Sequence, residues 1–103
     1  METELKLTTK RDGRELTISL NGEVNTLTAP ELEELLDAEL PETDSLLFDF
    51  SGCDSVSSAG LRVLLKTFKN LKARKGQMKI LNIGPNLREV LDITGLDLVF
   101  GCK

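Results

Sequence analysis

Alternating apolar and polar side chains mark the beginning of the chain. Residues 4–9 and 15–21 both follow a period of two, which is typical of a strand with one buried face. Asp12 and Gly13 stand between the two runs, and an Asp-Gly pair in that position favours a tight β-hairpin. The pattern therefore predicts that the chain begins with two antiparallel strands.

A helical period follows in residues 28–40. Thr28 offers a hydroxyl for the N-cap, Pro30 suits the first turn, and leucines recur three and four residues apart at positions 32, 35, 36 and 40. Proline cannot continue a helix, so we expect this one to stop before Pro41.

A second helix is predicted over residues 58–75. Its apolar side chains form one stripe, which we expect to be core: Leu61, Leu64, Leu65, Phe68 and Leu71. Gly76 follows directly, where a glycine often takes the left-handed conformation that ends a helix.

Short continuous apolar runs lie on either side of this helix, at residues 45–50 and 77–83. Such runs are expected of parallel strands buried on both faces. Residues 85–95 then show a third, shorter helical pattern that stops at Gly95, and residues 96–100, with the sequence LDLVF, are read as a last short strand.

The predicted order is therefore β-β-α-β-α-β-α-β, in one domain over residues 1–103. Helices that join successive buried strands require crossovers, so the expected fold class is α/β, with a mixed sheet made of the N-terminal hairpin and parallel strands. No window reaches the roughly 18 apolar residues of a membrane span, and the N-terminus lacks the apolar core of a secretory signal. We expect a soluble, cytoplasmic protein with no membrane partner.

The side chains available for chemistry are limited. The chain has no histidine, and its two cysteines, Cys53 and Cys102, lack the spacing of a zinc site. We expect both cysteines to be reduced and structural, and we expect no metal, no cofactor and no catalytic activity.

Charge is distributed unevenly along the chain, whose formal net charge is −4. Residues 28–40 carry five carboxylates and no basic side chain, whereas residues 58–75 carry six basic side chains and no carboxylate. These runs are either two solvated helix faces or a surface that docks a partner. Nucleic acid is a poor candidate for that partner, because the domain is acidic and has neither tyrosine nor tryptophan for stacking on bases.

Two serines stand where the second helix begins, after a predicted central strand. In open α/β sheets, ligands and functional groups collect at the carboxyl ends of the strands. Ser57 or Ser58 could simply cap the helix. A serine nucleophile would need a base, and without histidine only lysine could serve. A phosphate-binding loop is disfavoured because the turn has one glycine and no P-loop spacing. An exposed hydroxyl at a helix N-terminus is also a natural phosphorylation site.

The chain resembles the STAS domain family, and within it the bacterial anti-sigma factor antagonists. Residues 49–52 (DFSG) are similar to the family's Asp-Leu-Ser-Gly, and residues 57–61 (SSAGL) to the Asp-Ser-Ser-Gly-Leu that opens a helix. NGEVNTLTAPEL, from Asn21, and LREVLDITGLDLVF, from Leu87, extend the resemblance over nearly the whole chain. Ser57 and Asn25 stand where acidic residues are usual in the family.

The resemblance implies a binding module whose unmodified form binds a serine-kinase anti-sigma factor, releases the sigma factor, and is switched off by phosphorylation of Ser58. The implied partners are that kinase and a serine phosphatase, and we expect a monomer or weak dimer. The partner-binding surface is expected to comprise Asn25, Thr26, Ser57, Ser58, Ala59, Gly60 and Arg62.

Two alternatives stay open. One is a STAS subunit of another assembly, such as one docked on a transporter ATPase. The other is a nucleotide-sensing module that uses residues 22–28 and the Ser57–Gly60 turn.

Overall fold

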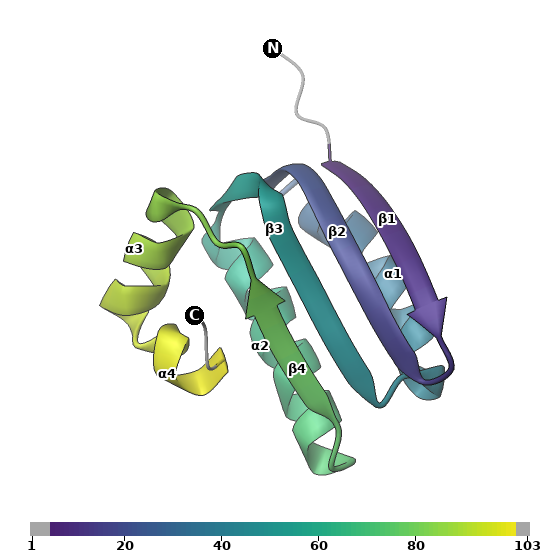
Figure 1. Cartoon of the computed structure of the whole chain (residues 1–103). Coiled ribbons are helices and arrows are strands. Elements are labelled where there is room, and N and C mark those ends of the chain that lie inside the picture. The colour runs from purple at the N-terminus through teal and green to yellow at the C-terminus, as the bar shows by residue number, and fades with distance from the viewer. Residues whose placement is uncertain (1–4, 101–103) are drawn as a thin grey trace.

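The computed structural model describes residues 5–100, which form one mixed four-stranded sheet and its helices (Figure 1). The elements in chain order are β1 (Leu5–Asp12), β2 (Glu15–Val24), α1 (Ala29–Glu39), the 3₁₀ turn η1 (Leu40–Glu42), β3 (Ser45–Val56), α2 (Ser58–Ala73), β4 (Gln77–Leu81), α3 (Pro85–Thr94) and α4 (Leu96–Phe100). The strands lie in the order β1-β2-β3-β4, with β1 antiparallel to β2 and the others parallel. The predicted α/β fold class is confirmed.

The N-terminal hairpin forms as predicted. Asp12 pairs with Glu15, so Gly13 and Arg14 make the two-residue loop. Gly13 has a φ of +64°, a left-handed conformation in which a β-carbon is strained. The Asp-Gly signal was therefore correct, with the glycine at the first position of the loop.

The helices α1 and α2 cover one face of the sheet, and α3 and α4 lie beside its β4 edge (Figure 1). Side chains of β3 alternate along the strand: Leu46, Phe48 and Phe50 are buried, whereas those between them are only partly covered. The prediction of strands buried on both faces is therefore wrong. A continuous apolar run does not separate a doubly covered strand from one whose second face is half open.

The strand β3 is longer than predicted and is irregular. Its pairing with β2 continues to Val56, with register shifts after Asp49 and after Gly52. At Gly52 a β-carbon would lie 3.0 Å from the Leu20 carbonyl oxygen, so the close approach of β2 favours glycine here. Only Ser57 then separates β3 from α2.

The end of α2 corrects the prediction for Gly76. Lys75, with a φ of +62°, takes the left-handed position, and the Gly76 amide donates to the Leu71 carbonyl at 2.7 Å in a Schellman-type ending. Gly76 is required for a different reason, because a β-carbon there would lie 2.7 Å from the Asp44 carbonyl oxygen. The first helix ends at Glu39, and Pro41 lies within η1.

The last element is a helix rather than the predicted strand. Leu96 and Phe100, four residues apart, pack inward on one helical face, and the Phe100 ring meets that of Phe68 edge-on at 5.8 Å. Leu98, which a strand would place on the same side, is 86% exposed. Gly95, with a φ of +77°, ends α3 as predicted. Cys102 lies outside the described residues.

Candidate functional site

The carboxyl ends of β2 and β3 bring two of the predicted site segments together. The strands are parallel, with Val24 opposite Val56, and the Ser57 amide donates to the Val24 carbonyl at 2.7 Å. The turn at residues 25–28 and the start of α2 therefore leave the same edge of the sheet. This is the edge at which α/β folds collect ligands and functional groups.

Asn25 organises the first of these segments. Its side-chain oxygen accepts hydrogen bonds from the amides of Leu27 at 2.9 Å and Thr28 at 3.1 Å, which closes an Asx turn. The Thr28 hydroxyl accepts from the Asn25 amide at 2.9 Å and donates to the Glu23 carbonyl at 2.7 Å. Thr28 occupies the predicted N-cap of α1 but makes no capping bond, because its hydroxyl is engaged in this turn.

The two serines differ in their surroundings. Ser57 is the N-cap residue of α2, yet its hydroxyl makes no capping bond and is buried without a hydrogen-bond partner in the described structure. Ser58 is the first helical residue and is exposed. The capping interpretation of these hydroxyls is therefore wrong, and the first amides of α2 have no carbonyl of their own helix to bind.

Gly60 fixes how the start of α2 sits on the sheet. A β-carbon there would lie 2.5 Å from a methyl of Val24 and 2.7 Å from one of Val56. Because only glycine allows this contact, the helix approaches the ends of β2 and β3 through Gly60, which is buried, while Ser58 is left exposed.

A shallow groove of about 260 Å³ runs between α1 and α2 beside these serines. It is lined by Thr26, Ala29, Pro30, Glu33, Ala59, Arg62, Val63 and Lys66. Lys66 Nζ lies 2.8 Å from a carboxylate oxygen of Glu33, so the acidic and basic helices meet in at least one ion pair. Three residues of the predicted partner surface, Thr26, Ala59 and Arg62, border the groove. Asn25, Ser57, Ser58 and Gly60 belong to the adjoining turn and helix start.

Asp54 is a positioning residue that the sequence interpretation missed. Its carboxylate accepts hydrogen bonds from the α3 amides of Leu87 at 3.0 Å and Asn86 at 3.4 Å. A β-carbon on Gly84, the N-cap of α3, would lie 2.5 Å from that carboxylate. The missing side chain of Gly84 thus lets β3 supply the cap, an arrangement that only the fold reveals.

Asp49, in the DFSG motif, also serves the structure. The Asn82 side-chain amide donates to it at 3.0 Å and the Ser51 amide at 2.9 Å. These bonds hold the pKa of the Asp49 carboxyl below its usual range, with the Asn82 bond the largest cause. Cys53 is buried, and this burial raises the pKa of its thiol, which disfavours the reactive thiolate.

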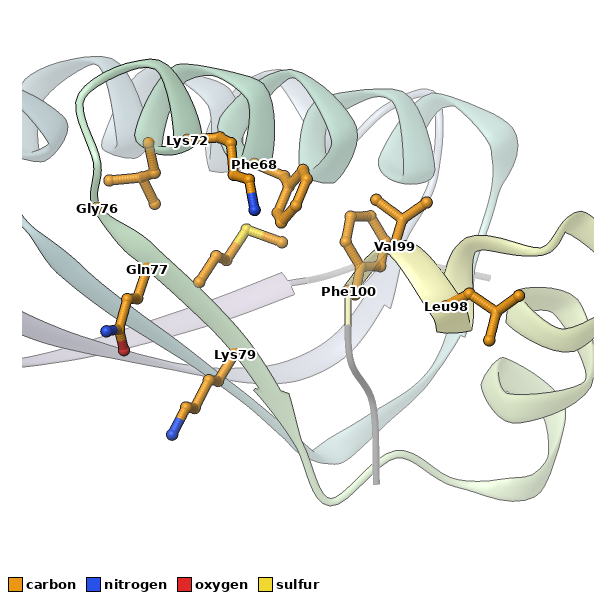
Figure 2. A pocket seen from close by; sticks show the side chains of 10 residues that line it. Phe68, Lys72, Gly76, Gln77, Lys79, Leu98, Val99 and Phe100 are labelled. Atoms are coloured by element: carbon orange, nitrogen blue, oxygen red, sulfur yellow. The ribbon is translucent and has the colours of Figure 1, made fainter.

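A larger hollow of about 320 Å³ lies at the opposite end of α2, against β4 and α4 (Figure 2). Its walls are mostly apolar and include Phe68, Met78 and Phe100, and Lys72 Nζ lies 5.7 Å from the centre of the Phe68 ring. None of the predicted site residues lines it. Within residues 5–100, no helix is long and apolar enough to cross a membrane, and no cluster of side chains could hold a metal ion.

Comparison with known proteins points to one family. The family model described as STAS domain matches residues 6–103. The protein named "Putative anti-sigma factor antagonist BtrV", from Bordetella bronchiseptica, is 34% identical over 97 residues, which cover 93% of this chain and 84% of that protein. The anti-sigma-B factor antagonist of Bacillus subtilis is 30% identical over 87 residues, covering 84% and 80%.

The fold of a solved relative is also similar. The crystal structure of an anti-sigma factor antagonist from Mycobacterium paratuberculosis superimposes with a TM-score of 0.85 at 27% identity, covering 96% of this chain and 85% of that chain. The same arrangement of sheet and helices is therefore found in a solved protein that is named an anti-sigma factor antagonist.

Proposed function

The chain belongs to the STAS domain family, and from this premise we propose that it is an anti-sigma factor antagonist. In its unmodified form it binds a serine-kinase anti-sigma factor and so releases the sigma factor. The observation that carries the proposal is the exposed hydroxyl of Ser58, at the first position of α2 and next to the Asn25 turn and the α1–α2 groove. The partner surface is proposed to comprise Asn25, Thr26, Ser57, Ser58, Ala59, Gly60 and Arg62.

Phosphorylation of Ser58 is the proposed off-switch. The kinase transfers the terminal phosphoryl group of a nucleoside triphosphate to the Ser58 oxygen, releasing the diphosphate and the hydroxyl proton. The formal charge moves from −4 to about −5.5 to −6. The chain is thus a substrate and a binding partner rather than an enzyme, and a serine phosphatase restores the binding form. We expect it to act in the cytoplasm as a monomer or weak dimer.

The added phosphate should act at the interface rather than on the fold. At a helix N-terminus a phosphate meets free amides and the positive end of the helix dipole, which favours it by about 0.3 to 1 kcal/mol at an exposed site. Burying the same dianion against a partner shaped for a neutral hydroxyl costs several kcal/mol. Because about 1.4 kcal/mol is tenfold in affinity, binding should fall by orders of magnitude.

The test is to map the phosphate. The kinase partner is isolated from the source cell with this chain as bait, purified, and incubated with the wild-type chain, Ser58→Ala and Ser57→Ala. We expect one phosphate, on Ser58, in the wild type and in Ser57→Ala, and none in Ser58→Ala by tandem mass spectrometry. Phosphate on Ser57, or undiminished incorporation into Ser58→Ala, contradicts the assignment. Recovery of a different partner with no phosphorylation contradicts the proposed function.

A further inference from the structure

Ser58 and Arg62 lie one helical turn apart on α2, and both are exposed. Side chains four residues apart lie on the same face of a helix, and the Cα–Cβ bonds tilt towards the N-terminus, so a group on Ser58 is within reach of the Arg62 side chain. A negative group that precedes a positive one at this spacing is the favourable orientation for an ion pair.

The two cations that line the α1–α2 groove are not equivalent. Lys66 is already 2.8 Å from a carboxylate oxygen of Glu33. Arg62 makes none of the ion pairs or side-chain hydrogen bonds found within residues 5–100. In the unmodified chain, Arg62 therefore offers its guanidinium to the groove.

We propose that Arg62 binds the phosphate of phosphorylated Ser58 within the same chain. The inference rests on the phosphorylation site of the proposed function. A guanidinium matches the oxygens of a phosphate with two parallel hydrogen bonds, which a lysine ammonium does not reproduce. Arg62 thus acts as a positioning residue that holds the modified serine in one orientation.

The pair gives phosphorylation two effects on the partner surface. It adds a dianion at the start of α2, and it withdraws the guanidinium of Arg62 from the groove beside Thr26 and Ala59. A partner that places a carboxylate near Arg62 loses that contact as it meets the phosphate. The modified and unmodified chains then differ by more than one added charge.

The experiment measures the phosphate itself and needs no kinase. Phosphoserine is incorporated at position 58 during synthesis of the chain, and the second ionisation of the phosphate is followed by phosphorus NMR in wild type, Arg62→Gln, Arg62→Lys and Lys66→Gln. The helix dipole acts equally in all four, so differences among them report the side chain that was changed.

We expect the phosphate pKa to be about 0.2 to 0.4 unit lower in the wild type than in Arg62→Gln, as an ion pair at this spacing should give. Lys66→Gln should match the wild type, Arg62→Lys should lie between, and the difference should shrink in 1 M salt as charges are screened. Equal pKa values in wild type and Arg62→Gln overturn the inference, as does an equal shift in Lys66→Gln.

This outcome is separable from that of the proposed function. If incorporated phosphate leaves affinity for the anti-sigma kinase unchanged while Arg62→Gln shifts the phosphate pKa, the switch fails and the ion pair stands. If the phosphate abolishes binding but Arg62→Gln shifts nothing, the switch stands and the ion pair fails.

Discussion

The two ends of the parallel strands are held in different ways. At the end where β3 begins, three arginines converge on residues 39–44. At the other end, where β2 and β3 finish, Asn25 and Thr28 close the turn, and the Ser57 hydroxyl has no partner within residues 5–100. Arginine side chains cross-link the first end, whereas the second end holds a buried hydroxyl that has no partner in the described part of the chain.

Arginine side chains tie the first end together over long distances in sequence. Arg11 donates to the Glu42 carbonyl, the Glu39 carboxylate and the Thr43 hydroxyl, each at 2.8 Å. Arg74, at the end of α2, donates to the carbonyls of Leu40 at 2.9 Å and Thr43 at 3.1 Å. Arg14 pairs with Asp44 at 2.6 Å. This arginine cluster (Arg11, Arg14 and Arg74) donates to polar groups of the chain reversal after α1, in addition to the bonds that Thr43 donates to the Leu40 and Glu39 carbonyls.

The candidate site lies at the opposite end, where β2 and β3 finish and α2 begins. Amides in the first turn of α2 have no acceptor within their own helix, and Ser58 stands beside them in solvent. The comparison teaches that the two ends differ in how they are held: arginine side chains cross-link the first end, whereas the second end caps α3 through Asp54 and leaves the Ser58 hydroxyl, the proposed phosphorylation site, exposed. Variants can test whether the two ends are as independent as this implies.

The largest effect should come from the core that joins both ends. Leu64 lies in the middle of α2 and is 1% exposed, so Leu64→Ala removes packing from the core on which α2 rests. We expect a loss of about 2 to 5 kcal/mol in the free energy of unfolding, measured by denaturant titration. A midpoint that barely moves would place Leu64 at the surface and undo the assignment of the α2 faces.

A smaller effect is expected from cutting the arginine cluster alone. Arg74→Ala removes the donor to the Thr43 carbonyl and one of two donors to the Leu40 carbonyl, which keeps the Thr43 amide, and should lower the free energy of unfolding by about 1 to 2 kcal/mol. Lys69→Ala, an exposed change on the same helix, is the control and should cost little. Affinity for the anti-sigma partner should be unchanged in both variants. A tenfold loss of affinity in Arg74→Ala would show that the two ends are coupled.

The smallest changes in stability are expected from Asn25 and Ser57, which lie at the carboxyl ends of β2 and β3. Asn25→Ala removes the acceptor of two turn amides and should cost about 1 kcal/mol. Asn25→Asp keeps a side-chain oxygen in place and should restore most of that stability. Ser57→Ala removes a hydroxyl that has no partner among residues 5–100, so its cost should stay within about 0.5 kcal/mol. If thermal melting shows Ser57→Ala to be the more damaging of the two alanine variants, Ser57 has a hydrogen bond that the structure lacks.

The sequence patterns predicted the features that depend on residues close together in the chain. The hairpin, the stripe of α2 and the Gly95 stop depend on residues close together in the chain, and the motif placed Ser58 at a helix start. The arginine cluster was not predicted, because Arg11 and Thr43 lie on segments that only the fold brings together. Gly76 was misread for the same reason: its requirement comes from the Asp44 carbonyl, not from the end of the helix.

Two other errors show where short patterns mislead. LDLVF is mostly apolar and was read as a strand, yet Leu96 and Phe100 stand four residues apart, and in the helix that forms the Phe100 ring packs on Phe68. At Ser57 the residue type and position fit an N-cap, but the hydroxyl makes no hydrogen bond to the amides of the first turn. Five residues, or one serine, carry too little information for tertiary packing to be inferred.

The central claim is that a phosphate on Ser58 abolishes binding of the anti-sigma kinase without unfolding the domain. Calorimetry on the unmodified chain, the chain phosphorylated on Ser58, Ser58→Glu and Ser58→Ala tests it directly, with thermal melting and titration against the anti-sigma kinase measured on the same samples. The phosphorylated chain should melt within a few degrees of the unmodified one while its affinity falls by orders of magnitude. Ser58→Glu should show the same loss more weakly, and Ser58→Ala should bind normally. If melting temperature and affinity collapse together, the switch is local unfolding and the account is wrong; if affinity is unchanged, Ser58 is not the switch.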